Sequence, residues 1–280
     1  MAVLQVNYMS QALWRIVPLQ VILPADKADT KGNLLPMRNF KTLYLLNGLH
    51  GTCTDWVVNT RIRRWAELHN LAVVMPAGDN SFYVDRVNGN NRYGEFVGRE
   101  LVEITRRMFP LSHKREDTFI GGLSMGGFGA ILNGLKYHET FGAIIGLSSA
   151  MNIFENKEDI GKAEWDFTES LFGDIELAKG TDKNPRVTAE KLIALKKEKP
   201  DTELPKIYMA VGEQDFLLPG NRAFKKLFED GGFDLTYVEA PGDHNWDFWD
   251  EFIRKAIEWL PLDEKSEGMD SGNIAASVAK

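Results

Sequence analysis

The chain of 280 residues has one cysteine, Cys53, and this scarcity excludes an intramolecular disulfide and a cysteine-rich metal site. It also lacks a long basic run: 33 Lys and Arg stand against 40 Asp and Glu, which gives a formal net charge of −7. Nucleic acid is therefore not an expected partner, because its phosphates call for concentrated positive charge. Nothing around Cys53 resembles a strand-to-helix turn, so this thiol is not the expected nucleophile.

Long apolar segments are absent as well. No stretch of about 18 consecutive apolar residues occurs, and the N-terminus has no basic segment followed by a sustained apolar one. These absences predict a cytoplasmic protein without a membrane partner. Since no linker rich in Pro, Gly or Ser divides the chain, we expect one domain over residues 1–263. A charged segment, about 150–205, is interpreted as a lid-like insertion or a solvated helical excursion, and 264–280 as a polar tail.

Apolar, β-prone segments alternate with amphipathic ones along the chain. Strands are predicted at 14–23, 42–46, 71–75, 118–121, 143–147, 207–211 and 235–239, and helices at 56–69, 95–109, 126–138, 186–198, 221–230 and 246–259. Several of the strands are continuously apolar, as expected for strands that are buried on both faces. The pattern predicts an α/β fold with a mostly parallel central sheet and helices on both faces.

The most informative motif is Gly122-Leu123-Ser124-Met125-Gly126, which follows the predicted strand at 118–121. Gly-x-Ser-x-Gly between a buried strand and a helix is typical of a sharp turn that presents a serine hydroxyl at the end of a sheet. Glycines at the flanks avoid collisions where the strand turns into the helix. Ser124 is therefore the candidate nucleophile.

A serine hydroxyl is a weak nucleophile at neutral pH and needs a base and an orienting acid. His244 lies in a loop after the last predicted strand, at the sheet edge where Ser124 must emerge, and is the candidate base. Asp215 follows the strand at 207–211 and is the candidate acid, with Glu213 as the second choice. The order Ser124, Asp215, His244 is the order of an α/β-hydrolase.

Acyl transfer also needs hydrogen-bond donors for the oxyanion of the tetrahedral intermediate. One donor is expected to be the backbone N–H of Met125, directly after the nucleophile. The second is assigned to the backbone N–H of Leu49, because Asn47-Gly48-Leu49-His50-Gly51 forms a glycine-rich turn after a buried strand. His50 is expected to shape this turn, since no partner ligand for a metal lies nearby in the sequence.

Several motifs together resemble the esterase D group of α/β-hydrolases, and most closely its bacterial branch of tributyrin and short-chain acetyl esterases. The resemblance covers roughly Val3 to Trp259 and rests on four segments: 45–51, 74–76 followed by 81–85, 120–127, and 242–246. Many relatives have His-Gly where this chain has Asn47-Gly48. Relatives that act on S-formylglutathione carry a cysteine close to the position of Gly51, and its absence here argues against that substrate.

The resemblance implies an α/β-hydrolase fold with a cap-like insertion and a serine carboxylesterase that needs no cofactor and no metal. Its implied substrates are small esters of short acyl groups, acetyl to butyryl. A carbohydrate acetyl or feruloyl esterase that acts on plant oligosaccharide esters is the alternative. Transfer of the acyl group to another alcohol and a non-catalytic binding module also remain open, as does homo-oligomer formation.

Candidate substrate contacts are less sharply defined by the sequence. Tyr83 and Asp85 follow the predicted strand at 71–75 and are within reach of a substrate in the predicted fold, although a role in stabilising a turn fits them equally. Trp246 follows the candidate base on a helix with an aromatic stripe, and it is a candidate for the acyl site or for the core.

Overall fold

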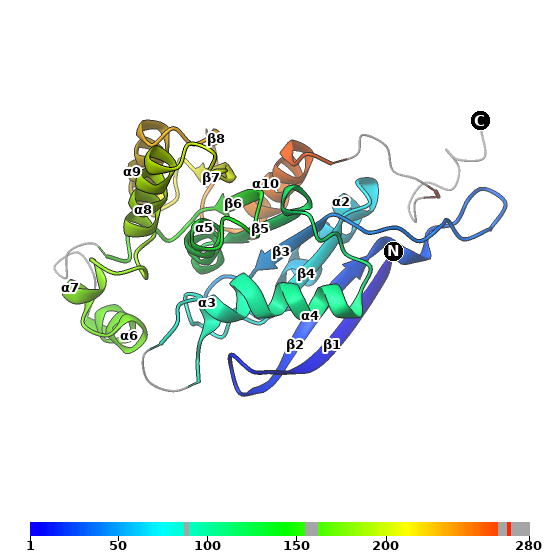
Figure 1. Ribbon diagram of the computed structural model, residues 1–280, viewed down its shortest axis with the longest axis horizontal. Coiled ribbons are helices and arrows are strands. Elements are labelled where there is room, and N and C mark those ends of the chain that lie inside the picture. The colour runs from blue at the N-terminus through cyan, green and yellow to red at the C-terminus, as the bar shows by residue number, and fades with distance from the viewer. Residues whose placement is uncertain (87–89, 155–161, 263–267, 270–280) are drawn as a thin grey trace.

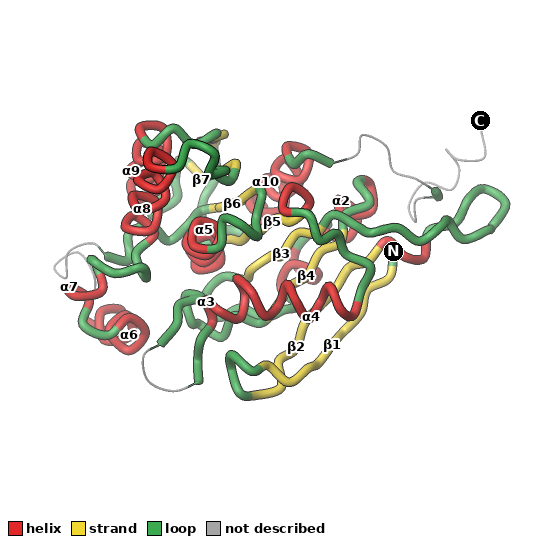
Figure 2. The backbone as a smooth tube through the Cα atoms, viewed as in Figure 1, coloured by secondary structure: helices red, strands yellow, loops and turns green. Residues whose placement is uncertain are grey.

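The computed structural model describes residues 1–86, 90–154, 162–262 and 268–269. Most of the predicted polar tail, 264–280, and a part of the predicted insertion, 155–161, lie outside the described residues. The described chain forms a central sheet between two layers of helices (Figures 1 and 2).

The sheet has eight strands in the order β1-β2-β4-β3-β5-β6-β7-β8. The strands are β1 (Ala2–Ser10), β2 (Arg15–Leu23), β3 (Thr42–Leu46), β4 (Ala72–Pro76), β5 (Thr118–Leu123), β6 (Ala143–Leu147), β7 (Lys206–Gly212) and β8 (Leu235–Ala240). From β4 to β8 all neighbouring strands are parallel, whereas β2 is antiparallel to both β1 and β4. The predicted mostly parallel sheet is confirmed.

Ten α-helical segments lie in the described residues: α1 (Asp55–Asn59), α2 (Ile62–Leu68), α3 (Tyr93–Glu95), α4 (Leu101–Met108), α5 (Met125–Lys136), α6 (Lys162–Phe172), α7 (Ile175–Ala178), α8 (Pro185–Glu198), α9 (Leu218–Asp230) and α10 (Trp246–Trp259). A π-helical turn at Phe96–Glu100 joins α3 to α4, and 3-10 turns lie at Pro24–Asp26 and Arg115–Asp117. The helix predicted at 56–69 is two helices, because Thr60 adopts extended backbone between them.

The strand residues alternate between two cores, one on each face of the sheet. In β3, Tyr44 and Leu46 pack in the core that α4, α5, α8 and α9 cover, and Leu43 and Leu45 pack in the core beneath α1, α2 and α10 (Figure 1). This period of two is the geometry of a strand that is buried on both faces. The predicted helices on both faces are confirmed.

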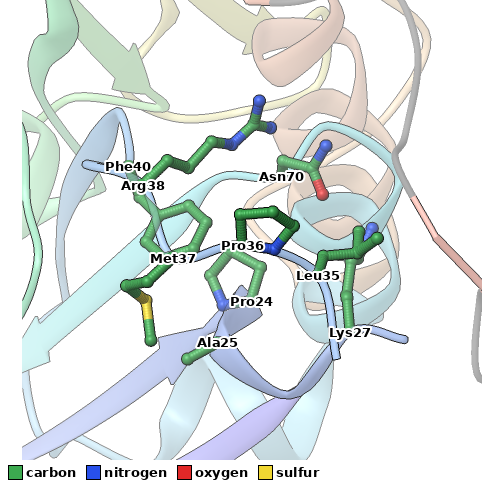
Figure 3. Close-up of a pocket in the computed structure, with 9 residues that line it drawn as sticks. All are labelled: Pro24, Ala25, Lys27, Leu35, Pro36, Met37, Arg38, Phe40 and Asn70. Carbon is green, nitrogen blue, oxygen red and sulfur yellow. The ribbon is translucent and has the colours of Figure 1, made fainter. Parts of the chain in front are cut away.

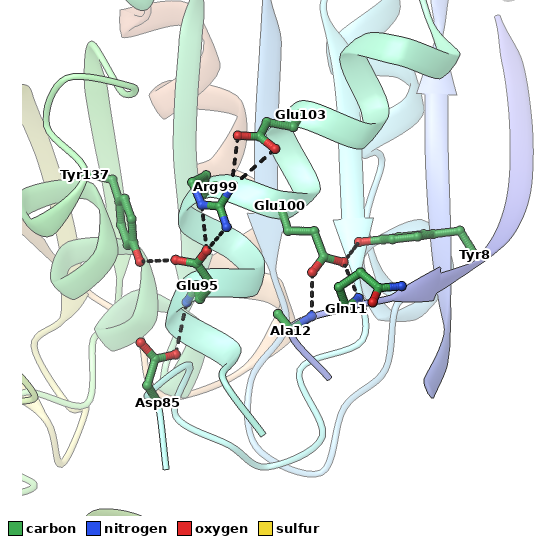
Figure 4. A network of polar contacts seen from close by, with 9 residues as sticks. All are labelled: Tyr8, Gln11, Ala12, Asp85, Glu95, Arg99, Glu100, Glu103 and Tyr137. Carbon is green, nitrogen blue, oxygen red and sulfur yellow. Dashed lines mark hydrogen bonds and ion pairs between the residues drawn. The ribbon is translucent and has the colours of Figure 1, made fainter. Parts of the chain in front are cut away.

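Strand β1 is the one strand that the sequence pattern did not predict. Its residues alternate between more and less exposed positions, as expected for an edge strand with one face toward solvent. The hairpin of β1 and β2 is tied to the helical layer through Glu100, whose carboxylate accepts hydrogen bonds from Tyr8 Oη (3.2 Å) and the backbone N–H groups of Gln11 (3.2 Å) and Ala12 (2.6 Å) (Figure 4).

A small cavity of about 20 Å³ lies beside the 24–40 loop (Figure 3). Phe40 and Asn70 line it just before β3 and β4 begin, so it lies at the amino ends of these strands. It is therefore at the edge of the sheet opposite Ser124, and its size suits about one water molecule. No helix in the described ranges is both long enough and apolar enough to cross a lipid bilayer.

Candidate active site

Ser124 lies between the end of β5 and the first residue of α5, in backbone conformation φ 53°, ψ −117°. A positive φ is strained for a residue other than glycine, and hydrogen bonds to neighbouring segments hold this conformation. Ser124 N–H donates to Leu147 O (2.9 Å), and Ser124 O accepts from Ala150 N–H (3.1 Å). Gly126 is required here, because a Cβ atom at this position would lie 2.5 Å from Leu46 O. The motif thus forms the predicted strand-to-helix turn.

Three side chains from distant parts of the chain meet at the carboxyl edge of the sheet. His244 Nε2 lies 3.1 Å from Ser124 Oγ, and His244 Nδ1 lies 3.0 Å from Asp215 Oδ2. The Asp215 side chain is fully buried, and that of His244 is 19% exposed. Glu213, the second candidate acid, has an exposed side chain and is not hydrogen-bonded to the imidazole. The geometry therefore allows proton transfer from Ser124 to an imidazole held by Asp215.

The carboxylate of Asp215 is surrounded by donors. Burial alone would raise its pKa, but hydrogen bonds from His244, from the Ser148 hydroxyl and from the Leu217 backbone N–H bring the pKa below the usual 3.8. The carboxylate is consequently ionised at neutral pH and can accept the Nδ1 proton of the imidazole. Ser148 Oγ in turn accepts a hydrogen bond from Trp249 Nε1 at 3.1 Å.

The turn after β3 presents an unpaired donor beside the serine. Within the described residues, neither Leu49 N–H nor Met125 N–H has a hydrogen-bond partner. His50, at φ 64°, donates its own N–H to Asn80 Oδ1 (2.6 Å) and so fixes the outer part of the turn. Two free N–H groups beside a serine are what an oxyanion requires.

Asn47 fixes the start of this turn from within the protein. Its Oδ1 accepts hydrogen bonds from Gly78 N–H (2.9 Å) and Tyr83 Oη (3.1 Å), and its Nδ2 donates to Gly48 O (2.8 Å). Tyr83 Oη also lies 3.1 Å from Asn47 O. Asn47 and Tyr83 are both buried, so the side-chain support of the turn comes from protein groups alone.

A cleft of about 470 Å³ opens onto the serine, and we refer to it as the serine cleft. Its lining residues are Gly48, Leu49, His50, Gly51, Asp55, Leu123, Ser124, Phe216, His244, Trp246 and Trp249. The His244 ring lies between the aromatic rings of Phe216 and Trp249, with centroid distances of 4.8 and 4.9 Å. Trp246, a candidate for the acyl site or for the core, lines this cleft, and its role as a substrate contact stays a prediction.

Tyr83 and Asp85 are placed elsewhere. They line a second cavity of about 140 Å³, the lysine cavity, together with Val84, Gly94, Leu132, Asn133, Lys136, Asp182 and Lys183. Asp85 Oδ1 accepts the Glu95 backbone N–H at 3.0 Å (Figure 4). Lys136 Nζ lies 3.8 Å from Asp85 Oδ2. The contacts of Tyr83 and Asp85 therefore fit the turn-stabilising role that the sequence also allowed: Tyr83 supports the turn after β3, and Asp85 supports the start of a helix.

Three residues at the site were not found by the sequence reasoning. Ser148 directly follows β6, and a polar residue after a central parallel strand was an available signal for it. Asp55 and Phe216 enter the serine cleft from α1 and from the loop after β7, and no local pattern marks either one. In the described ranges, no three His, Cys, Asp or Glu side chains gather in an arrangement that suits a metal ion.

The described residues of 150–205 do not line the serine cleft. Helix α8 packs on α5 and α9, and Phe172 of α6 contacts Phe82 and Phe128 with ring centroids 5.9 and 6.0 Å away. This part of the chain covers the helical layer beside the lysine cavity. Its predicted action as a lid stays a prediction.

Comparison with known proteins agrees with this architecture. Residues 10–260 match the family model described as "Putative esterase". An acetyl esterase of Caldicellulosiruptor saccharolyticus is 43% identical over 267 residues, which cover 93% of this chain and 98% of the relative.

Two solved structures from Staphylococcus aureus are similar over nearly their whole length. The fluorophosphonate-binding serine hydrolase FphF has a TM-score of 0.80 and 32% identity, with 94% of this chain and 99% of that chain covered. The S-formylglutathione hydrolase FrmB has a TM-score of 0.79 and 32% identity, with 92% and 98% covered. The α/β-hydrolase fold and the resemblance to the esterase D group are confirmed, and the chain belongs to this esterase family as a serine carboxylic ester hydrolase.

Proposed function

We propose that the protein hydrolyses esters of short acyl groups, acetyl to butyryl, with Ser124 as nucleophile, His244 as general base and Asp215 as the acid that orients the imidazole. The observation that carries this proposal is the hydrogen-bonded series from Asp215 through His244 to Ser124, at 3.0 and 3.1 Å. The acetyl esterase among the relatives supports the short acyl group.

The reaction follows from these positions. Ser124 Oγ attacks the ester carbonyl carbon while His244 Nε2 takes the hydroxyl proton, and Asp215 stabilises the imidazolium that forms. The backbone N–H groups of Leu49 and Met125 donate to the oxyanion of the tetrahedral intermediate. The imidazolium then protonates the departing alcohol and leaves an acyl-serine. Water, deprotonated by His244, then attacks that acyl group, the bond to Ser124 Oγ breaks, and the imidazolium returns the proton to Ser124 Oγ as the acid leaves.

The size and lining of the serine cleft support a small substrate. A volume of about 470 Å³ is enough for a short acyl group together with a small alcohol group. The cleft is lined by Phe216, Trp246 and Trp249 and by the polar turn 48–51.

The test is hydrolysis of p-nitrophenyl acetate, butyrate and octanoate, methyl ferulate and an acetylated xylo-oligosaccharide by wild type and by Ser124→Ala. We expect kcat/KM to fall by about 10³-fold or more in Ser124→Ala, with unchanged melting temperature. Ser170→Ala, at an exposed serine of α6, is the matched control and should keep wild-type activity.

The turnover of each substrate tests one part of the proposal. Acetate and butyrate turnover that exceeds octanoate turnover supports the short-chain range, and a preference for the xylo-oligosaccharide or the ferulate identifies a carbohydrate esterase instead. Ester turnover that survives in Ser124→Ala would contradict the assigned nucleophile. Absence of turnover and of fluorophosphonate labelling in the wild type would favour a binding module.

A further inference from the structure

Asp55, the first residue of α1, brings a carboxylate into the serine cleft. The space that the carboxylate occupies exists because residue 51 is a glycine: a Cβ atom at Gly51 would collide with Asp55 Oδ2. The backbone N–H of Thr52 stabilises the ionised form of this carboxylate. Gly51 and Asp55 therefore form one wall of the cleft that holds Ser124.

This carboxylate lacks a cation to neutralise it. No lysine or arginine lines the serine cleft, and Asp55 is the only carboxylate among its lining residues in the described part of the chain. Burial raises the pKa of Asp55 above the usual 3.8, and the Thr52 N–H opposes that rise. Two other carboxylates are each paired with an arginine: Asp79 with Arg15, and Asp250 with Arg61.

An unpaired charge in a partly closed cleft acts on the substrate more strongly than a charge on an open surface. The aromatic side chains of Phe216, Trp246 and Trp249 line the same cleft, and such walls lower the local dielectric constant and reduce screening. A charged group on the ester would therefore feel the field of Asp55 even without direct contact.

We propose that Asp55 is a specificity-determining residue through which the serine cleft accepts neutral and cationic esters and rejects anionic ones. This inference rests on the proposed esterase function and adds to it the charge class of the substrate. The charge acts on the acyl part, the alcohol part or both, since both lie within one cleft.

Pairs of esters that share a shape and differ in charge test the inference. For the alcohol part, 3-acetoxypropanoate is compared with its neutral isostere 3-methylbutyl acetate, and acetylcholine with 3,3-dimethylbutyl acetate. For the acyl part, monomethyl succinate is compared with methyl 4-methylpentanoate. The measured quantity is the ratio of kcat/KM within each pair, in wild type and in Asp55→Asn, at low ionic strength.

In wild type we expect the anionic member of a pair to be disfavoured and the cationic member to be favoured. In Asp55→Asn the anion-to-neutral ratio should rise by about tenfold and the cation-to-neutral ratio should fall by several fold, as expected for one charge removed at close range. Added salt should raise the anion-to-neutral ratio of the wild type itself, because ions screen the field of Asp55. This second measurement needs no variant.

Asparagine keeps the size of the side chain and an oxygen near the Thr52 N–H, so Asp55→Asn removes the charge with little change of shape. Asp201→Asn, at an exposed turn before β7, removes the same charge from the protein surface and is the matched control. We expect its ratios to equal those of the wild type.

The outcomes separate this inference from the proposed function. If the ratios shift for the acyl pair alone, or for the alcohol pairs alone, the inference is supported. The pair that shifts then identifies the part of the ester that Asp55 faces. If all ratios are equal in wild type and Asp55→Asn while turnover still requires Ser124, the proposed role of Asp55 is wrong and the proposed function stands. Turnover that does not require Ser124 overturns the proposed function as well.

Discussion

The serine cleft and the lysine cavity differ in how their charged groups are paired. In the lysine cavity, Lys136 Nζ lies 2.8 Å from Asp182 Oδ2 and 3.8 Å from Asp85 Oδ2, so protein groups neutralise one another. In the serine cleft, Asp55 has no cation among the lining residues, and Leu49 N–H has no acceptor within the described residues.

The difference separates structural support from chemistry. Polar groups that are satisfied within the protein stabilise the fold, whereas donors and charges left free in an open cleft are available to a ligand. Tyr83 joins the two regions, because it lines the lysine cavity and its hydroxyl reaches Asn47 at the start of the turn after β3. Substitutions in the serine cleft should therefore reduce turnover, whereas substitutions in the lysine cavity should cause only small changes in stability.

The largest effect in this comparison is expected for Asp215→Asn. The asparagine amide keeps the size of the side chain, but it cannot hold the imidazole in the tautomer that accepts the Ser124 proton, so kcat should fall by about 10³- to 10⁴-fold. Glu213→Gln, at the exposed acid two residues earlier, is the control and should stay within about threefold of wild type. A loss in Glu213→Gln that matched the loss in Asp215→Asn would contradict the assignment of the acid.

An intermediate effect is expected for Tyr83→Phe, which removes the hydroxyl that supports the turn. The Leu49 N–H would lose its fixed position, and we expect kcat to fall by about tenfold with KM within about twofold, because the donor acts mainly on the transition state. The loss of one buried hydrogen bond should also lower the free energy of unfolding by about 1 kcal/mol.

Tyr44→Phe is the matched control for this prediction. Tyr44 is buried as well, and its hydroxyl lies 2.8 Å from Thr105 Oγ1, away from the serine cleft. It should lose a similar amount of stability and keep its kcat. Equal kcat values for the two variants would show that Tyr83 stabilises the fold without acting on the turn.

The smallest effect is expected for Lys136→Met in the lysine cavity. The ion pairs of Lys136 are partly exposed, and such pairs contribute about 1 kcal/mol or less. The melting temperature should fall by about 2 °C or less, and kcat/KM for p-nitrophenyl acetate should stay within about twofold. A tenfold loss of activity in this variant would show that the lysine cavity takes part in the reaction.

The sequence predicted those parts of the molecule that are encoded locally. A buried strand, Gly-x-Ser-x-Gly and an apolar helix determine the turn at Ser124, because the backbone there depends on a few adjacent residues. The same reasoning predicted the alternation of strands and helices and the sheet edge at which Asp215 and His244 meet Ser124. Strand β1 was missed because apolar residues such as Val3 and Met9 stand at its exposed positions, so its sequence lacks a clear alternation, and pairing with β2 defines the strand.

The tertiary structure decided which side chains face one another. His244 lies 120 positions from Ser124. The sequence places both at one edge and favours Asp215 over Glu213 as the acid, but only the structure shows which carboxylate contacts the imidazole. It also could not show that Tyr83 faces Asn47 or that Asp55 enters the serine cleft. Local patterns fix backbone conformation, but the direction of a side chain depends on packing against segments far away in the sequence. That packing decides which polar groups remain free for a substrate.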